Sequence, residues 1–381
     1  MVVGGVLWRA PISRNQTDAL PSLRWEQLTN FNDAAEIPAL SPDGKTVAFL
    51  RGPDSFGTSA NGGEIWLKSL PDGEPVQITR TGLRKQTIAF SPDGNRLYFT
   101  QLEGPFAWNT YELPIVGGKE PKLLLPNATG LSWISADRTL FSTIRAGIHM
   151  KLVTSNVSRT EERDVYVPTD HAQGMVHRSA RSPDGKWVLL SEMDSAWWKR
   201  CRLVPFDGSS AGHPVGPEGS CTWAQWSADG KWMYFTADAR TSGFHVWRQS
   251  FPDGVPRQVT PSGASEEEGL AMMPDGKSFI TSAGIRESSI WLHDEKTGDK
   301  QITSEGYSFL PALSPDGRKV YYLRRTTASH SYFSGELWVS DLASGSAERL
   351  FEGLVLTHFS ISPDGKRIVF ATRGHQGVQA A

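Results

Sequence analysis

One segment of the chain matches a pattern that serine hydrolases use. Gly208-Ser209-Ser210-Ala211-Gly212 fits Gly-x-Ser-x-Gly, and His213 follows it directly. A nucleophile elbow places its serine on a sharp turn between a strand and a helix. Here strand-forming residues stand on both sides of the segment, so the pattern predicts a turn between two strands. We therefore expect no nucleophilic catalysis by Ser210, and we expect the chain not to be an enzyme.

Histidines and carboxylates are the other groups with which this chain could perform chemistry. The nine histidines are scattered and show no metal-ligand spacing. His177 and His358 stand at the starts of predicted innermost strands, where they either face a central channel or make ordinary hydrogen bonds. Glu268 ends a run of three glutamates that either lines a channel mouth or is a solvated loop. We expect no cofactor and no metal, and a hydrolase or lyase with its site in the channel is the alternative function.

The two cysteines, Cys201 and Cys221, are too few for a cysteine metal site. They either form a disulfide, which is typical of an oxidising compartment, or remain two buried free thiols. The net charge of −2 gives no basic footprint for nucleic acid.

The first 24 residues differ from the rest of the chain. Val2–Trp8 is apolar but far shorter than the ~20 residues that span a bilayer. It is either a disordered start or the end of a membrane helix that begins before this chain. Residues 9–24 are polar and aperiodic, which predicts a linker. We therefore predict a membrane-proximal or disordered segment over 1–24 and one folded domain over 25–381.

That domain is organised by a repeated tetrapeptide, Ser-Pro-Asp-Gly. Eight copies follow one another at a spacing of about 46 residues, a period typical of repeat folds. Five are complete, two carry one change, and the worn third copy is Ser135-Ala136-Asp137-Arg138. The copies start at residues 41, 91, 135, 182, 227, 273, 314 and 362.

Each repeat unit contains four short strand signals and no helical period. In residues 37–80 the strand signals lie at 37–40, 46–50, 65–67 and 76–79, with turns between them. Consecutive four-stranded units of this length predict an all-β fold, a β-propeller. We predict eight blades, with seven as the alternative. The last unit is short, so we expect the N-terminal strand Glu26–Thr29 to complete it and close the ring.

The tetrapeptide itself has a structural explanation. Proline presets φ near −65°, aspartate suits the next position, and glycine supplies the positive φ that ends the turn. The eight aspartates are therefore expected to serve local turns rather than to bind metal.

The Ser-Pro-Asp-Gly turn followed by an apolar strand resembles the TolB-like, WD-repeat-like propellers. This resemblance covers nearly the whole domain and implies the fold. Such propellers occur as periplasmic interaction modules, as the first domain of prolyl-oligopeptidase-type peptidases and as sensor-like ends of bacterial membrane proteins. More narrowly, three segments resemble the C-terminal propellers of bacterial membrane-anchored Ser/Thr protein kinases: Trp25–Phe31, Leu50–Pro53 and Leu70–Gln77. That resemblance implies a sensor or scaffold on the periplasmic side, tethered by a segment before this chain, with a cytoplasmic location as the alternative. The chain itself carries no kinase motif.

The longest loops connect second and third strands, on the face opposite the Ser-Pro-Asp-Gly turns. Variable loops on a rigid ring are where binding residues concentrate. Their aromatic side chains either anchor a protein, peptide or small ligand or cover gaps between blades. With His177, His358 and Glu268, these are the candidate partner-binding residues: Phe56, Phe106, Trp197, Trp198, Tyr332 and Phe333.

Overall fold

The computed structural model contains strands and no helix among the residues that it describes. These residues are 24–52, 63–104, 107–117, 120–145, 149–195, 197–239, 243–262, 266–276, 278–284, 287–325, 334–374 and 377–380. Phe56, Phe106, Tyr332 and Phe333 lie outside them, as does the segment 1–23. The predicted domain bounds, 1–24 and 25–381, therefore stay a prediction.

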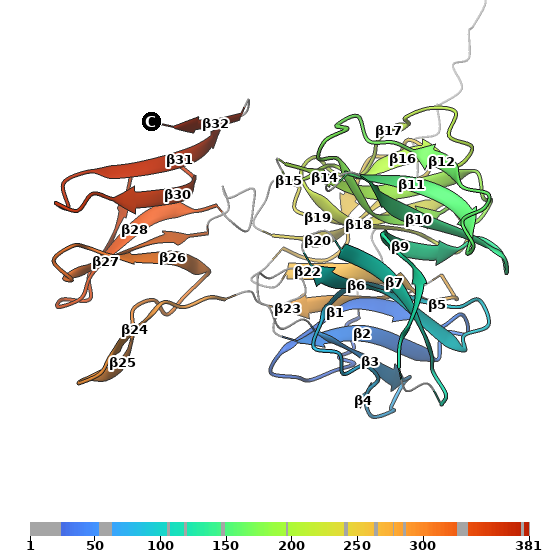
Figure 1. Cartoon of the computed structure of the whole chain (residues 1–381), viewed down its shortest axis with the longest axis horizontal. Helices are drawn as coiled ribbons and strands as arrows, with labels where there is room; N and C mark the ends of the chain where they lie inside the picture. Colours follow the sequence, from blue (N-terminus) through green and yellow to red (C-terminus); the bar gives the residue numbers. More distant parts are fainter. Residues whose placement is uncertain are drawn as a thin grey trace, which may run out of the picture.

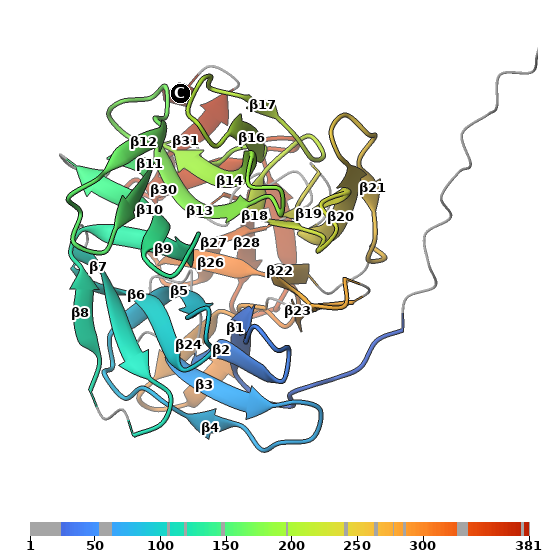
Figure 2. The same cartoon turned by 90° about the vertical axis from the view of Figure 1, so that its right-hand side faces the viewer.

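Six consecutive repeat units surround a common axis (Figures 1 and 2). In chain order, units 1 to 5 consist of β1–β4, β5–β8, β9–β12, β13–β17 and β18–β21. Each has four main strands, and unit 4 carries an additional short strand, β15. Unit 6 contributes the hairpin β22–β23. The strands are β1 (Ala34–Leu40), β2 (Thr46–Gly52), β3 (Glu64–Ser69), β4 (Val76–Gln77), β5 (Arg84–Phe90), β6 (Arg96–Gly104), β7 (Ala107–Pro114), β8 (Lys122–Leu125), β9 (Ala128–Trp133), β10 (Arg138–Arg145), β11 (His149–Asn156), β12 (Arg163–Tyr166), β13 (Met175–Arg181), β14 (Trp187–Asp194), β15 (Trp197–Trp198), β16 (Arg202–Pro205), β17 (His213–Pro214), β18 (Cys221–Trp226), β19 (Trp232–Ala237), β20 (His245–Ser250), β21 (Arg257–Gln258), β22 (Glu266–Met272) and β23 (Phe279–Gly284).

The remaining strands form a second group beside the ring, shown in orange and red in Figure 1. It holds the separate hairpin β24–β25, the four-stranded unit 7 and the three-stranded unit 8. Its strands are β24 (Trp291–Asp294), β25 (Gly298–Gln301), β26 (Ser308–Leu313), β27 (Lys319–Arg324), β28 (Glu336–Asp341), β29 (Ala347–Leu350), β30 (Leu356–Ile361), β31 (Ile368–Gly374) and β32 (Gly377–Ala380).

The four-stranded repeat and the propeller fold class are confirmed, but the count of eight blades is not. Strand β22 contacts β18 on one side and β1 on the other, so the ring closes after unit 6. The expectation that Glu26–Thr29 completes the last unit is wrong. In the described chain no strand covers these residues, and β32 is the strand that pairs with β31.

The Ser-Pro-Asp-Gly turns form as their residue types predict. In the first turn the Ser41 hydroxyl donates to Asp43 Oδ1 at 2.6 Å and accepts from Thr46 N at 2.9 Å. Gly44 has a φ of 69°, the region in which glycine is least strained. The worn copy keeps the Ser135–Asp137 hydrogen bond at 2.7 Å. These aspartates are thus occupied by local turns.

The turns of neighbouring units also pack on one another. A β-carbon placed on Gly94 would lie 3.5 Å from Cδ of Pro42, in the turn of the preceding unit. A β-carbon on Gly230 would lie at the same distance, 3.5 Å, from Cδ of Pro183. One on Gly44 would lie 2.9 Å from Cδ of Pro274, where the ring closes. A row of turn-to-turn contacts therefore runs along one end of the ring.

Hydrogen-bonded side-chain triads join some consecutive units. Between units 1 and 2, Glu64 accepts from Thr79 Oγ1 and, at 2.8 Å, from Lys85 Nζ. Burial raises the pKa of Glu64, but the hydrogen bonds from Lys85 and Thr79 outweigh it and hold that pKa below its usual value.

The triad between units 5 and 6 has the opposite polarity. His245 Nδ1 lies 2.9 Å from Glu267 Oε2, and Thr260 Oγ1 donates to the same oxygen at 3.0 Å. Here the carboxylate comes from the inner strand β22, where the first triad has its lysine on β5. The acidic side chain therefore belongs to the earlier unit in the first triad and to the later unit in the second.

A disulfide joins units 4 and 5. Cys201 and Cys221 are both fully buried, and their sulfur atoms are bonded. Of the two alternatives for these cysteines, the structure has the bonded one.

Candidate functional site

The strongest cluster of polar and aromatic side chains lies around the axis, at the end of the ring opposite the Ser-Pro-Asp-Gly turns. His177 and Arg178 stand near the start of β13, whereas the turn of unit 4 follows the end of that strand. Trp108 and Trp198 come from β7 and β15, which begin at the same end. The cluster therefore lies near the axis, on the face of the ring that carries the long loops.

Arg178 is the charged centre of the cluster. Its Nη1 donates to the backbone oxygen of Thr222 at 2.8 Å, and its guanidinium lies 4.3 Å from the ring centroid of Trp223. Burial lowers the pKa of Arg178 to about 10, and the carboxylates of Glu268 and Glu36 oppose that shift. Arg178 therefore stays charged at neutral pH, and its charge is balanced from the two units that close the ring.

His177 is held between two tryptophans. Its ring centroid lies 5.5 Å from that of Trp108 and 5.0 Å from that of Trp198. Burial, together with repulsion from Arg178 and Arg84, lowers the pKa of His177 to about 3. Its Nε2 has no hydrogen-bond partner among the described residues. His177 is thus a neutral ring between two tryptophans, with one buried nitrogen that has no partner among the described residues.

Trp197 presents a strained backbone at the edge of this cluster. Its φ is 131°, a value that residues with a β-carbon rarely adopt, and its side chain is half-buried. Strain of this kind concentrates at binding sites, where the surrounding structure maintains it. The neighbouring Trp198 is buried and packs on His177.

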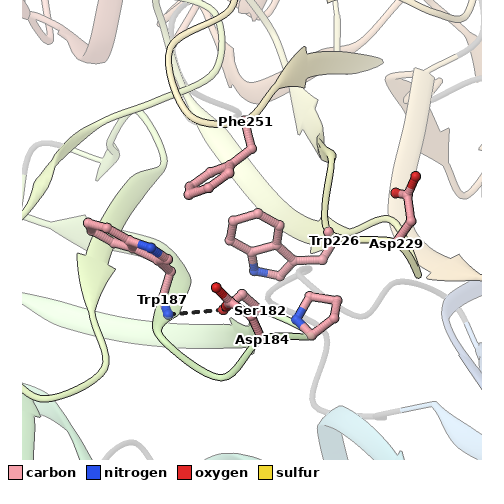
Figure 3. A pocket seen from close by; sticks show the side chains of 8 residues that line it. Ser182, Asp184, Trp187, Trp226, Asp229 and Phe251 are labelled. Carbon is pink, nitrogen blue, oxygen red and sulfur yellow. Dashed lines mark hydrogen bonds between the residues drawn. The ribbon is translucent and has the colours of Figure 1, made fainter.

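A small pocket lies at the other end of the ring, between the turns of units 4 and 5 (Figure 3). Trp187, Trp226 and Phe251 form its aromatic wall, and the carboxylates of Asp184 and Asp229 stand at its rim. Its volume is about 120 Å³. Small-molecule sites are usually larger than ~300 Å³, so this pocket suits a single side chain rather than a whole ligand.

The groups around this pocket are already engaged in the fold. Trp226 Nε1 donates to the backbone oxygen of Ala180 at 3.0 Å, and the Trp226 and Phe251 rings pack edge to face at 5.3 Å. The hydrogen bond from Ser182 holds the pKa of Asp184 below its usual value. The axial cluster, with its unpartnered buried nitrogen, is therefore the better candidate site.

The structure brings together some of the predicted site residues and separates others. His177 and Trp198 are in contact, Trp197 adjoins them, and the Glu268 carboxylate is close enough to raise the pKa of Arg178 against the effect of burial. His358 lies on β30 in the second group, exposed and away from this cluster. The sequence prediction missed Arg178, Trp108 and Trp223, although Arg178 is the direct neighbour of His177.

The hydrolase-like segment is a loop between strands, as predicted. Ser210 lies between β16 and β17, with no helix after it, and His213 is exposed. Within the described stretches, no group of three histidine, cysteine or acidic side chains is placed to bind a metal ion. The search for a membrane-spanning helix, made over the same residues, found none that is long and apolar enough.

Comparisons with known proteins give similarity in structure only. No protein-family model matches the chain, and no curated protein matches its sequence. A TolB-type protein from Agrobacterium tumefaciens is 18% identical with a TM-score of 0.53, covering 68% of this chain and 93% of its own. TolB from Acinetobacter baumannii is 15% identical with a TM-score of 0.43, covering 86% of this chain and 66% of its own.

Solved structures of enzymes are also among the matches. A puromycin hydrolase is 14% identical with a TM-score of 0.42, covering 89% of this chain and 58% of its own. Likeness at this level of identity concerns the fold and not the activity. With its four-stranded antiparallel units around an axis and its match to the Agrobacterium protein, the chain has the fold of a TolB-like β-propeller.

Proposed function

We propose that this propeller is a non-catalytic module that binds a protein or peptide at the long-loop end of its axis. The observation that carries the proposal is the cluster of Trp108, His177, Trp198 and Arg178, which combines aromatic faces with a buried cation. Tryptophan and arginine are the residues that most often anchor protein interfaces. The Nε2 of His177 is buried at this cluster and has no hydrogen-bond partner among the described residues.

We further propose that the module works outside the cytoplasm as the sensor or scaffold part of a membrane-anchored bacterial kinase or regulator. The buried disulfide supports an oxidising compartment, where such bonds persist. The kinase association rests on the sequence resemblance alone. It is tested by the reading frame upstream of Met1, which should encode a membrane helix and kinase motifs; a stop codon directly before Met1 would count against it.

The binding proposal is tested by selecting peptides from a random displayed library on the intact protein. Selected peptides are then measured on Trp108→Ala and on the control Trp291→Ala, whose tryptophan is exposed on β24. Loss of an interface anchor costs at least ~2 kcal/mol, or about 30-fold in Kd. We expect that loss for Trp108→Ala and unchanged binding for the control. Equal binding to both variants, or turnover in a hydrolase substrate screen, would overturn the proposal.

A further inference from the structure

We propose that the chain has a second closed arrangement, a ring of eight units, in which unit 7 replaces unit 1 on the surface of unit 6. This inference concerns the architecture and is independent of the proposed binding function. It rests on a surface of unit 7 that repeats the closing surface of unit 1, and on the division of unit 6 between the two groups.

The first observation is that unit 7 repeats the surface with which unit 1 closes the ring. Residues 38–44 and 311–317 have the same sequence, Pro-Ala-Leu-Ser-Pro-Asp-Gly. In unit 1 this segment packs on unit 6: a β-carbon on Gly269 would lie 2.7 Å from Cδ of Pro38, and one on Gly44 2.9 Å from Cδ of Pro274. Unit 6 thus accepts a surface that the chain contains twice.

The second observation is that the copy in unit 7 has no such contact. A β-carbon on Gly317 would meet no described residue within 4 Å, although one on Gly365 of unit 8 would lie 3.6 Å from Cδ of Pro315, as in the ring. Leu310 and Ile37 are equivalent and share a positive φ, 50° and 56°. Leu310 is nevertheless 43% exposed, whereas Ile37 is 1% exposed. The surface of unit 7 is shaped for a contact that it does not make here.

The third observation concerns unit 6, which is divided between the two groups. Its strands β22 and β23 lie in the ring, while β24 and β25 form a separate two-stranded sheet. In units 1, 5 and 7 the third strand pairs with the second and places a tryptophan opposite an aromatic residue: Phe49 with Trp66, Phe235 with Trp247, and Tyr322 with Trp338. The equivalent tryptophan of unit 6, Trp291, is 59% exposed. In the eight-unit ring, β24 would pair with the outer edge of β23, as the third strand does in the other units.

An ion pair already holds the second group beside unit 6. Arg325, directly after β27, lies 3.1 Å from Glu266 at the start of β22. This pair joins the long-loop ends of units 7 and 6, which would be neighbours in the eight-unit ring. The exchange replaces the segment 38–44 of unit 1 with the identical segment 311–317 of unit 7 and places Leu310 where Ile37 packs now. It buries the exposed Trp291 in addition. Burial of apolar surface favours the larger ring.

Site-directed crosslinking tests the proposal in the full chain. Lys45, Asp275 and Arg318 are exposed positions beside these turns. Asp275→Cys with Lys45→Cys reports the six-unit ring, and Asp275→Cys with Arg318→Cys reports the eight-unit ring. Because Cys201 and Cys221 are bonded to each other, a short bis-maleimide reacts with the introduced thiols alone. Asp184→Cys with Lys231→Cys is the matched control, since Gly230 contacts Pro183 in the ring.

We expect the control and the 275–318 pair to link within monomers, as identified by mass spectrometry of the linked peptides. Leu310→Asp should remove the 275–318 link and keep the 275–45 link, while Leu354→Asp, at a similarly exposed leucine, should change neither. A 275–318 link that is absent while the control forms would overturn the proposal. A 275–318 link confined to dimers would also overturn it, because the surfaces would then be exchanged between two copies.

Discussion

Replacing Cys201 and Cys221 by alanine, singly and together, tests the bond that joins units 4 and 5. The two cysteines are 20 residues apart in sequence. Closing a loop of this length restricts the unfolded chain and stabilises the folded state by about 3 kcal/mol. With a urea dependence of about 3 kcal/mol/M, the midpoint should fall by about 1 M. Unfolding is followed by the fluorescence of the tryptophans near β18.

The double-mutant cycle distinguishes a bond from two packed thiols. If the disulfide forms, either single variant already removes it, so the double variant should lose little more than each single one. A reducing agent should lower the midpoint of the unmodified chain and leave the double variant unchanged. Two free thiols would instead give small, additive losses and no response to the reducing agent, and that result would refute the bonded arrangement.

Three further predictions follow from the hydrogen bonds and charges of the units. Thr260→Ala should cost about 1–3 kcal/mol, because Thr260 Oγ1 bonds both Val246 N and Glu267; urea unfolding should show a smaller loss for Thr303→Ala, whose hydroxyl accepts from Ile290 N. The folded pKa of His177 lies at about 3, below its unfolded value, so folded chains bind this proton less readily than unfolded ones. Stability should therefore fall by about 1.4 kcal/mol per pH unit between pH 6.5 and 3, and His177→Gln should lose that slope in denaturation curves measured at each pH. Hydrogen bonds from serine and backbone N–H groups lower the pKa of the turn aspartates, for example Asp43 and Asp316, so their contribution is present above about pH 4 and lost as the pH falls through the folded pKa values; circular dichroism should show less acid loss in Asp316→Asn, and an unchanged acid transition would contradict the assignment.

The parts of the fold that the sequence predicted are those held by local contacts. The turn at Ser41 needs only groups within five residues, so its residue types suffice to predict it. The sequence Gln-x-Thr, which occurs at 77–79 and at 27–29, forms a contact of the same local character. Gln77 Nε2 donates to Thr79 O at 2.8 Å, and Gln27 repeats this bond with Thr29 at 2.9 Å. At Gln27 the bond forms without strand pairing, which explains why the predicted ring closure by Glu26–Thr29 was wrong.

The candidate site depends on contacts between units, which the repeat pattern does not specify. Trp108 of unit 2 meets His177 of unit 4, and Arg178 of unit 4 faces carboxylates from units 6 and 1. These residues are far apart in the chain and lie at positions that differ from one unit to the next. Their meeting follows from how many units the ring holds, and that number was the weakest part of the prediction.

The two triads, with the carboxylate on opposite sides of the boundary between units, favour one order of the units over others. Unit 1 presents Glu64, at the start of β3, to unit 2, and Lys85 of unit 2 supplies the matching cation. Unit 5 presents His245, at the start of β20, to unit 6, and Glu267 of unit 6 supplies the carboxylate. A contact between units 1 and 6 at these positions would set the half-buried Glu64 against the buried Glu267, two carboxylates with one threonine between them. Repeated units with similar strands can pair in the wrong order, and a contact between two carboxylates disfavours that order while the chain folds.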